Sequence, residues 1–111
     1  MPRSGLRAER RTVWWYRRRG YRILAVNAWA GGHELDVVVR RGRKLIFCEV
    51  KEKDGDRFGD PLEMVDEEKQ RRLRRAAVSW LAAHPEAHGL HVSFDVMAVR
   101  GRQLERLAEA F

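Results

Sequence analysis

Two short acidic segments contain the residues whose types and spacing point to catalysis. Glu34 and Asp36 stand one residue apart in an apolar stretch. Glu49 and Lys51 have the same spacing near the end of a second apolar stretch. Side chains on a strand alternate between its faces, so each pair shares a face. Carboxylates gathered in this way repel unless a proton, a lysine or a divalent cation neutralises them, and oxygen ligands favour Mg²⁺ or Mn²⁺. We therefore predict a metal site at Asp36 and Glu49, with Lys51 beside it.

An N-terminal helix, expected over residues 4–19, supplies a further acid. The residues of its inward face recur at offsets of three and four: Leu6, Glu9, Val13 and Tyr16. Glu9 thus lies on the apolar side of a helix that is otherwise rich in arginine. A buried carboxylate is costly unless it is paired. Two interpretations stay open: Glu9 pairs with Arg10 or Arg22, or it points into the same metal site.

The segments that carry the acids are expected to form a hairpin of strands 34–39 and 44–51. A turn at Arg41-Gly42 would pair residue 34 with residue 49 and place Asp36 diagonally from Glu49, at about 7 to 8 Å between backbones. Alternation then places Leu35 and Val37 together on the face opposite Glu34 and Asp36. On the second strand, one face carries Phe47, Glu49 and Lys51, and the other carries Ile46, Cys48 and Val50. The competing interpretation is an edge-strand salt bridge between Glu49 and Lys51, with Asp36 solvated.

The remaining elements predict an α/β fold with a mixed sheet. They are a strand over 21–26, a glycine-containing loop over 27–33, an exposed loop over 52–60, a helix over 66–83 capped by Asp66, and a strand over 92–99. Residues 103–111 suit either a helix or a strand that returns through Gly101. With 111 residues, the chain suits one domain, 1–111.

The charge distribution predicts a polyanion as partner. The net charge is +7, and the basic residues gather near the N-terminus and around Lys69 and Arg72. A segregated positive charge of this kind favours nucleic acid, with solvated helix faces as the plain alternative. Exposed tryptophans stack on bases, and Trp29, in the glycine loop, is the tryptophan that we expect to contact nucleic acid.

The location expected for the chain is the cytoplasm. The N-terminus lacks the apolar run of a secretory signal, and no stretch has the roughly 18 to 20 apolar residues of a membrane helix. Cys48 is the one cysteine, which suits a reducing compartment. We expect no association with a membrane.

Five segments, in order, resemble one known family. They are Gly20-Tyr21-Arg22-Ile23-Leu24 with Glu9 before it, His33-Glu34-Leu35-Asp36-Val37-Val38, Phe47-Cys48-Glu49-Val50-Lys51, the Lys69 to Leu81 helix, and Phe94-Asp95-Val96. Together they resemble the YraN family, which is largely uncharacterised. That family is assigned to the PD-(D/E)XK nuclease superfamily, near archaeal Holliday-junction resolvases. The resemblance implies a restriction-endonuclease-like three-layer core, with a mixed central β-sheet flanked by helices.

The resemblance also implies roles for individual residues. Asp36 takes the first acid of the superfamily, Glu49 the second, Lys51 the lysine and Glu9 the helix carboxylate. Lys51 would orient the attacking water or offset charge on the phosphate. Glu34 would be a neighbouring group or the partner of an arginine. Their positive charge, rather than the resemblance, is the reason to expect contacts to the nucleic-acid backbone from Lys69, Arg72, Arg10 and Arg11.

The implied function is the hydrolysis of phosphodiester bonds in nucleic acid. We expect DNA as the substrate in preference to RNA, and branched DNA is one candidate form of that substrate. Junction-resolving relatives suggest a homodimer. The alternatives are a non-catalytic nucleic-acid-binding module of the same fold and a protein that binds a partner through the acidic segment 52–68.

Overall fold

The structure is a computed structural model that describes residues 4–53 and 65–111. Helix α1 (Ser4–Arg18) opens the chain and ends in arginines, which suit the negative end of a helix dipole. Gly20 follows with a φ of 87°, the left-handed conformation that ends many helices. The predicted first helix is confirmed. The side chain of Leu6 lies outside those that the structure describes.

Five strands form one mixed sheet in the order β1-β2-β3-β4-β5. Their bounds are β1 Arg22–Ala30, β2 His33–Arg41, β3 Lys44–Glu52, β4 His91–Arg100 and β5 Gln103–Leu107. Neighbours are antiparallel except β3 and β4, which are parallel. A parallel pair needs a crossover, and helix α2 (Glu67–Ala82) lies in this connection. For residues 103–111 the sequence left a helix and a strand as alternatives. The structure has a strand, because Arg100 pairs with Gln103 across a tight turn.

The first strand extends beyond its predicted end. Residues 28–30 were expected in a loop but pair with β2, and only Gly31 and Gly32 form the turn. Both glycines have positive φ, 59° and 77°, which a two-residue hairpin turn of type I′ requires. The turn also touches α2: a Cβ on Gly31 would lie 3.2 Å from the carbonyl oxygen of Arg75. The glycine pair therefore makes a tight hairpin with its tip against the helix.

Helix α2 confirms the predicted long helix and its cap. Asp66 precedes it in an extended conformation, and its side chain accepts a hydrogen bond of 2.8 Å from the backbone N–H of Lys69. The buried residues recur at helical spacing: Leu73, Ala76, Ala77 and Trp80. A short 3₁₀ turn, η2 (Pro85–Ala87), then leads into β4. The predicted loop 52–60 lies largely outside the described residues.

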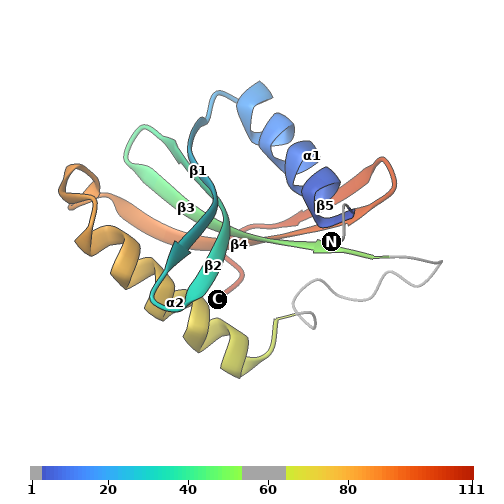
Figure 1. Cartoon of the computed structure of the whole chain (residues 1–111). Coiled ribbons are helices and arrows are strands. Elements are labelled where there is room, and N and C mark those ends of the chain that lie inside the picture. Colours follow the sequence, from blue (N-terminus) through green and yellow to red (C-terminus); the bar gives the residue numbers. More distant parts are fainter. Residues whose placement is uncertain (1–3, 54–64) are drawn as a thin grey trace.

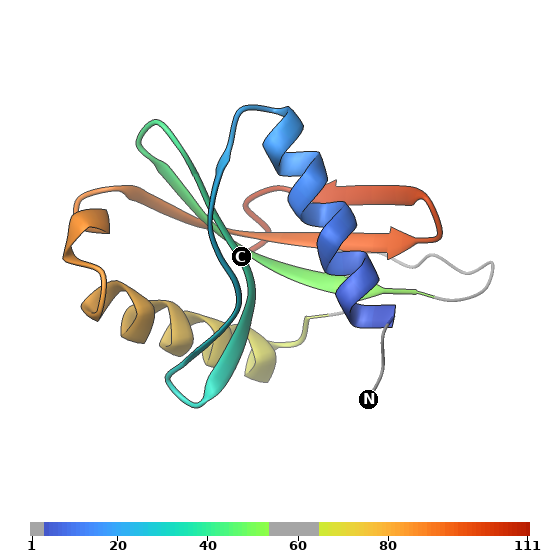
Figure 2. The same cartoon turned by 45° about the horizontal axis from the view of Figure 1, so that its top comes forward.

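The sheet is covered by one helix on each face, which gives three layers (Figures 1 and 2). One cluster of buried residues packs beneath α2 and includes Val38, Leu45, Phe47, Leu73, Trp80 and Val96. The other packs beneath α1 and includes Ala8, Tyr16, Val37, Ile46, Cys48 and Met97. The predicted fold class is confirmed: an α/β protein with the three-layer arrangement of restriction-endonuclease-like cores. Within residues 4–53 and 65–111, no helix has the length and apolar character needed to cross a membrane.

Candidate active site

The candidate site lies where β2 and β3 separate. Their last paired residues are Val37 and Cys48, and the same register carried one step further places Asp36 directly opposite Glu49. The predicted pairing of residue 34 with residue 49 is wrong, because Arg41 pairs with Lys44 and the turn consists of Gly42 and Arg43. Instead of a further ladder bond, the backbone N–H of Val50 donates a hydrogen bond of 2.9 Å to Oδ2 of Asp36. The Asp36 carboxylate is thereby held against β3.

The strand that carries Asp36 twists at this point. Leu35 packs in the cluster beneath α2, whereas Val37 packs in the cluster beneath α1. The prediction that they share a face is therefore wrong. Across the hairpin, Asn27 lies between the pairs Val26–Val37 and Ala28–Leu35 and has a φ of 54°, which is rare outside glycine. Both strands of the hairpin thus depart from regular geometry beside Asp36, which opens the sheet at the acids. The faces predicted for β3 are confirmed: Phe47 packs beneath α2, and Ile46, Cys48 and Val50 pack beneath α1.

Three carboxylates from two elements converge here. One oxygen from each of Glu9, Glu34 and Asp36 lies within 4.8 Å of the others. Glu9 comes from α1 and is only 9% exposed. Burial raises its pKa, a hydrogen bond from Asn27 partly offsets this, and the charges of Glu34 and Glu49 raise it further. Among the described residues Glu9 forms no ion pair with Arg10 or Arg22, so α1 presents it to the acids of the sheet.

Glu49 adds a fourth carboxylate, which is 5% exposed. Its Oε2 lies 2.8 Å from the Lys69 ammonium group, which α2 supplies from the other layer. Its Oε1 is buried and has no hydrogen-bond partner among the described residues. Burial, and then the charge of Glu49, raise the pKa of Asp36 to about 8. A buried oxygen without a donor and a carboxyl that resists ionisation both indicate a place where a cation would be stabilised.

Lys51 lies on the same face of β3 as Glu49 and is partly buried, beside Ala98 of β4. The structure records no ion pair between Lys51 and a described residue, so the alternative prediction of a Glu49–Lys51 salt bridge is wrong. The lysine that forms an ion pair with Glu49 is Lys69. Sequence reasoning assigned Lys69 to the nucleic-acid backbone from its charge alone. Its position three residues after the capping Asp66 was the available signal, because it places Lys69 in the first turn of the helix that covers β3.

The residues predicted to contact nucleic acid occupy varied positions. Arg72 forms an exposed ion pair of 2.5 Å with Glu68 on α2. Arg10 is exposed and Arg11 is partly exposed on α1. Trp29 is 74% exposed and pairs with Glu34 across the β1–β2 hairpin. Directly opposite residues bring their side chains together, so Trp29 lies at the edge of the acidic cluster, which we define as Glu9, Glu34, Asp36 and Glu49. Their binding to nucleic acid stays a prediction.

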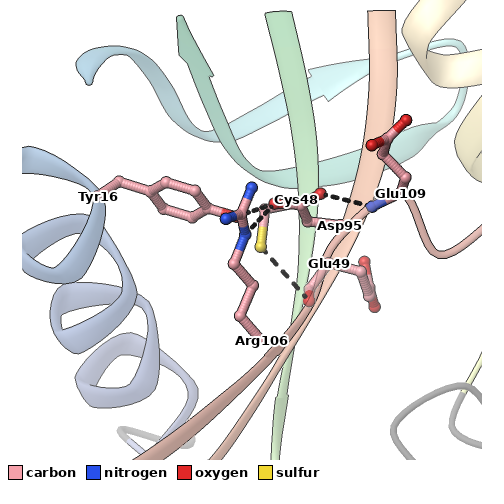
Figure 3. Close-up of polar contacts among 6 residues, drawn as sticks. All are labelled: Tyr16, Cys48, Glu49, Asp95, Arg106 and Glu109. Atoms are coloured by element: carbon pink, nitrogen blue, oxygen red, sulfur yellow. Dashed lines mark hydrogen bonds and ion pairs between the residues drawn. The ribbon is translucent and has the colours of Figure 1, made fainter. Parts of the chain in front are cut away.

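A separate buried network surrounds Asp95 on the α1 side of the sheet (Figure 3). The Tyr16 hydroxyl donates a hydrogen bond of 2.5 Å to Oδ2 of Asp95, and Nε of Arg106 lies 2.7 Å from the same oxygen. The backbone N–H of Glu109 donates to Oδ1. Asp95 is 1% exposed and joins α1, β4 and the segment after β5. Figure 3 shows the Glu49 carboxylate pointing away from these contacts, so the network supports the sheet and lies apart from the acidic cluster.

The acidic cluster has the donor set that a hard divalent cation requires. Its oxygens come from Glu9, Glu34, Asp36 and Glu49, and hard ions such as Mg²⁺ take oxygen ligands. Glu34 is exposed, and its carboxylate is one of the three that converge. The sequence predicted only a neighbouring group or the partner of an arginine. The residues present therefore suit a Mg²⁺ or Mn²⁺ ion better than zinc, which prefers nitrogen and sulfur.

Comparison with known proteins matches residues 8–99 to the uncharacterised protein family UPF0102. A UPF0102 protein of Frankia casuarinae is 48% identical over 80 residues, which cover 72% of this chain and 67% of the relative. One of Nitrobacter winogradskyi is 39% identical over 103 residues, which cover 93% and 86%. One of Frankia alni is 52% identical over 66 residues, which cover 60% and 54%. The match confirms the YraN-like resemblance, and the names of these relatives state no activity.

Proposed function

Because the chain belongs to the uncharacterised protein family UPF0102, whose name assigns no chemistry, we propose a function from the site itself: a metal-dependent nuclease that hydrolyses phosphodiester bonds in DNA. One observation carries the proposal. The carboxylates of Glu9, Glu34 and Asp36 converge where β2 and β3 separate, and the buried Oε1 of Glu49 lacks a partner among the described residues. A stable fold gains nothing from such a cluster. Membership of the PD-(D/E)XK superfamily is part of this proposal.

Asp36, Glu49 and Glu9 would hold a Mg²⁺ or Mn²⁺ ion. When bound, such an ion lowers the pKa of water and offsets charge on a phosphate. The chain contributes the fixed positions of the ligands. The backbone N–H of Val50 orients Asp36, Lys69 orients Glu49, and α1 holds Glu9 at 9% exposure. Ligands fixed before binding cost little reorganisation during the reaction.

Lys51 would act on the substrate. It follows Glu49 on the same face of β3, and the structure records no ion pair between it and a described residue. An ammonium group in this position orients the attacking water or offsets the negative charge that develops on the phosphate. Around the site, Arg72, Arg10 and Arg11 would hold the backbone of the nucleic acid without reading its sequence. Cutting both strands of a duplex would call for a homodimer.

The second candidate is a non-catalytic nucleic-acid-binding module of the same fold. The ion pair between Lys69 and Glu49 favours it, because a lysine already neutralises one of the acids. Such a module would bind nucleic acid in a salt-sensitive way through its net charge of +7. It would not need Asp36 or Glu49 for binding.

Cleavage assays separate the two candidates. The panel contains duplex, single-stranded, flap and four-way-junction DNA, with matched RNA, in Mg²⁺, in Mn²⁺ and in EDTA. We expect metal-dependent cleavage that is lost in Asp36→Ala, Glu49→Gln and Lys51→Ala, while circular dichroism shows that these variants fold. Glu105→Gln, which removes an exposed acid on β5, is the matched control. Binding without cleavage of any substrate would overturn the nuclease proposal in favour of the second candidate.

A further inference from the structure

A pocket of about 170 Å³ lies at the other end of the first two strands from the acidic cluster. Its lining includes Arg22, Leu24, Arg40, Trp80, His84 and Glu86. Arg40 is four residues beyond Asp36 on β2, which separates the pocket from Asp36 by about 13 Å along the strand. The pocket is therefore distinct from the candidate active site and shares no residue with it.

Two arginines face each other in this pocket. Arg22 and Arg40 are directly paired in the β1–β2 register, so their side chains leave the sheet on the same face. Like charges in this arrangement are destabilising unless an anion lies between them. Nε of Arg40 donates a hydrogen bond of 2.9 Å to the carbonyl oxygen of Gly42, which leaves its terminal nitrogens available. Among the described residues, neither guanidinium forms an ion pair with Glu86, the one acid in the lining.

The opposite wall is aromatic and fixed. Trp80 is 5% exposed, and the His84 ring stacks on it with centroids 3.8 Å apart. Nδ1 of His84 lies 2.7 Å from the carbonyl oxygen of Trp80. A carbonyl only accepts hydrogen bonds, so Nδ1 carries the hydrogen, and Nε2 is the ring nitrogen left for a ligand. The wall thus offers a ring face and a nitrogen in a set orientation.

We propose that this pocket binds a phosphate group, either of a nucleotide or of a nucleic-acid backbone. Two guanidinium groups from neighbouring strands supply several charged donors, and charge-assisted bonds of arginine to phosphate are among the strong ones. A phosphate between the two arginines would also relieve their mutual repulsion. Glu86 opposes binding and limits its strength. The site needs no metal and is independent of the proposed nuclease function.

The test is a titration of the ¹⁵N-labelled chain in EDTA, followed by NMR. The probes are inorganic phosphate, a deoxynucleoside 5′-monophosphate and a short single-stranded oligonucleotide, each compared with chloride at equal ionic strength. We expect saturable shifts of the backbone amides of residues 22, 40, 84, 86 and 87. Arg22→Gln and Arg40→Gln should each weaken binding about tenfold. Glu86→Gln should strengthen it, and Arg102→Gln, at an exposed turn, should leave it unchanged.

Each result has a definite meaning. Saturation by the monophosphate identifies a nucleotide site, and saturation by the oligonucleotide alone identifies a contact to the nucleic-acid backbone. Shifts that chloride reproduces, or binding that both arginine variants retain, overturn the proposal. Because EDTA removes divalent ions, failure of this test leaves the nuclease proposal intact. Failure of the cleavage assay likewise leaves the phosphate pocket intact.

Discussion

The Lys69 ammonium group lies 2.8 Å from Oε2 of Glu49, although the two residues belong to different layers of the fold. Only 6% of the Glu49 side chain and 28% of the Lys69 side chain are exposed. The backbone N–H of Lys69 is itself held by the capping carboxylate of Asp66. The start of α2 thus fixes the cation that orients Glu49, whose second oxygen has no hydrogen-bond partner among the described residues.

Removing Lys69 should expose this dependence. In Lys69→Met the buried carboxylate of Glu49 loses its partner, so we expect the free energy of unfolding to fall by about 3 kcal/mol. Arg72→Met, on the same helix, breaks an exposed ion pair with Glu68 and should cost less than about 1 kcal/mol. Urea denaturation measures both values. Saturating Mn²⁺ should restore part of the stability of Lys69→Met. Equal losses in the two variants would contradict an orienting role for Lys69.

The raised pKa of Asp36 predicts how stability depends on pH. The pKa is 3.8 for an unperturbed aspartate and about 8 in the folded chain. Between these values the folded state keeps a proton that the unfolded state has lost. The contribution of Asp36 to stability is therefore complete below about pH 4 and declines as the pH rises towards 8, by up to about 1.4 kcal/mol per pH unit. Denaturation of wild type and Asp36→Asn from pH 5 to 8 isolates this slope. Parallel profiles would contradict it.

Cation binding should release that proton. A metal ligand must be ionised, and Asp36 keeps its proton near neutral pH because burial and the charge of Glu49 raise its pKa. Calorimetric titration with Mn²⁺ at pH 7, in buffers of different ionisation enthalpy, should therefore report close to one proton released per ion. Asp36→Asn should abolish both the binding and the release. Binding with no proton release would show that the ion occupies a site without Asp36.

Most elements of this fold could be predicted because their signals are local. Asp66 caps α2 from its own neighbourhood, and the apolar repeat from Leu73 to Trp80 is contained within one helix. The register of β2 against β3 could not be predicted. A turn at Gly42-Arg43 and one at Arg41-Gly42 differ by one residue, and both suit the sequence equally well. The Glu49–Lys69 contact was missed for a related reason: it joins two layers, and only tertiary packing brings them together.

Trp29 allows a test of nucleic-acid contact at the edge of the acidic cluster. Its indole is 74% exposed, so Trp29→Ala should leave the melting temperature unchanged. If a base stacks on it, the affinity for a single-stranded oligonucleotide should fall by about 1 to 3 kcal/mol. Fluorescence anisotropy measures this. Trp14→Ala is the control, since Trp14 is 58% exposed on α1 and lies beneath the Arg18 guanidinium. Equal losses in both variants would indicate a general effect of exposed tryptophans.

The Asp95 network should matter for stability and not for the metal. Tyr16 and Arg106 both contact Oδ2 of Asp95, and burial is the main reason why the pKa of the Tyr16 hydroxyl is raised. Tyr16→Phe removes one hydrogen bond to a buried charge and should cost about 2 kcal/mol. Asp95→Asn also removes the ion pair with Arg106 and should cost about 3 kcal/mol or more. Urea denaturation gives both values.

The same two variants should bind Mn²⁺ with the affinity of the wild type. Figure 3 places the Glu49 carboxylate away from Asp95, although the two residues lie on neighbouring strands, so the loss of the network leaves the acids in position. Glu49→Gln provides the opposite behaviour, since it should remove metal binding while keeping the fold. If Asp95→Asn lost Mn²⁺ binding and remained folded, the metal site would depend on the Asp95 network, and the separation of the two clusters would be wrong.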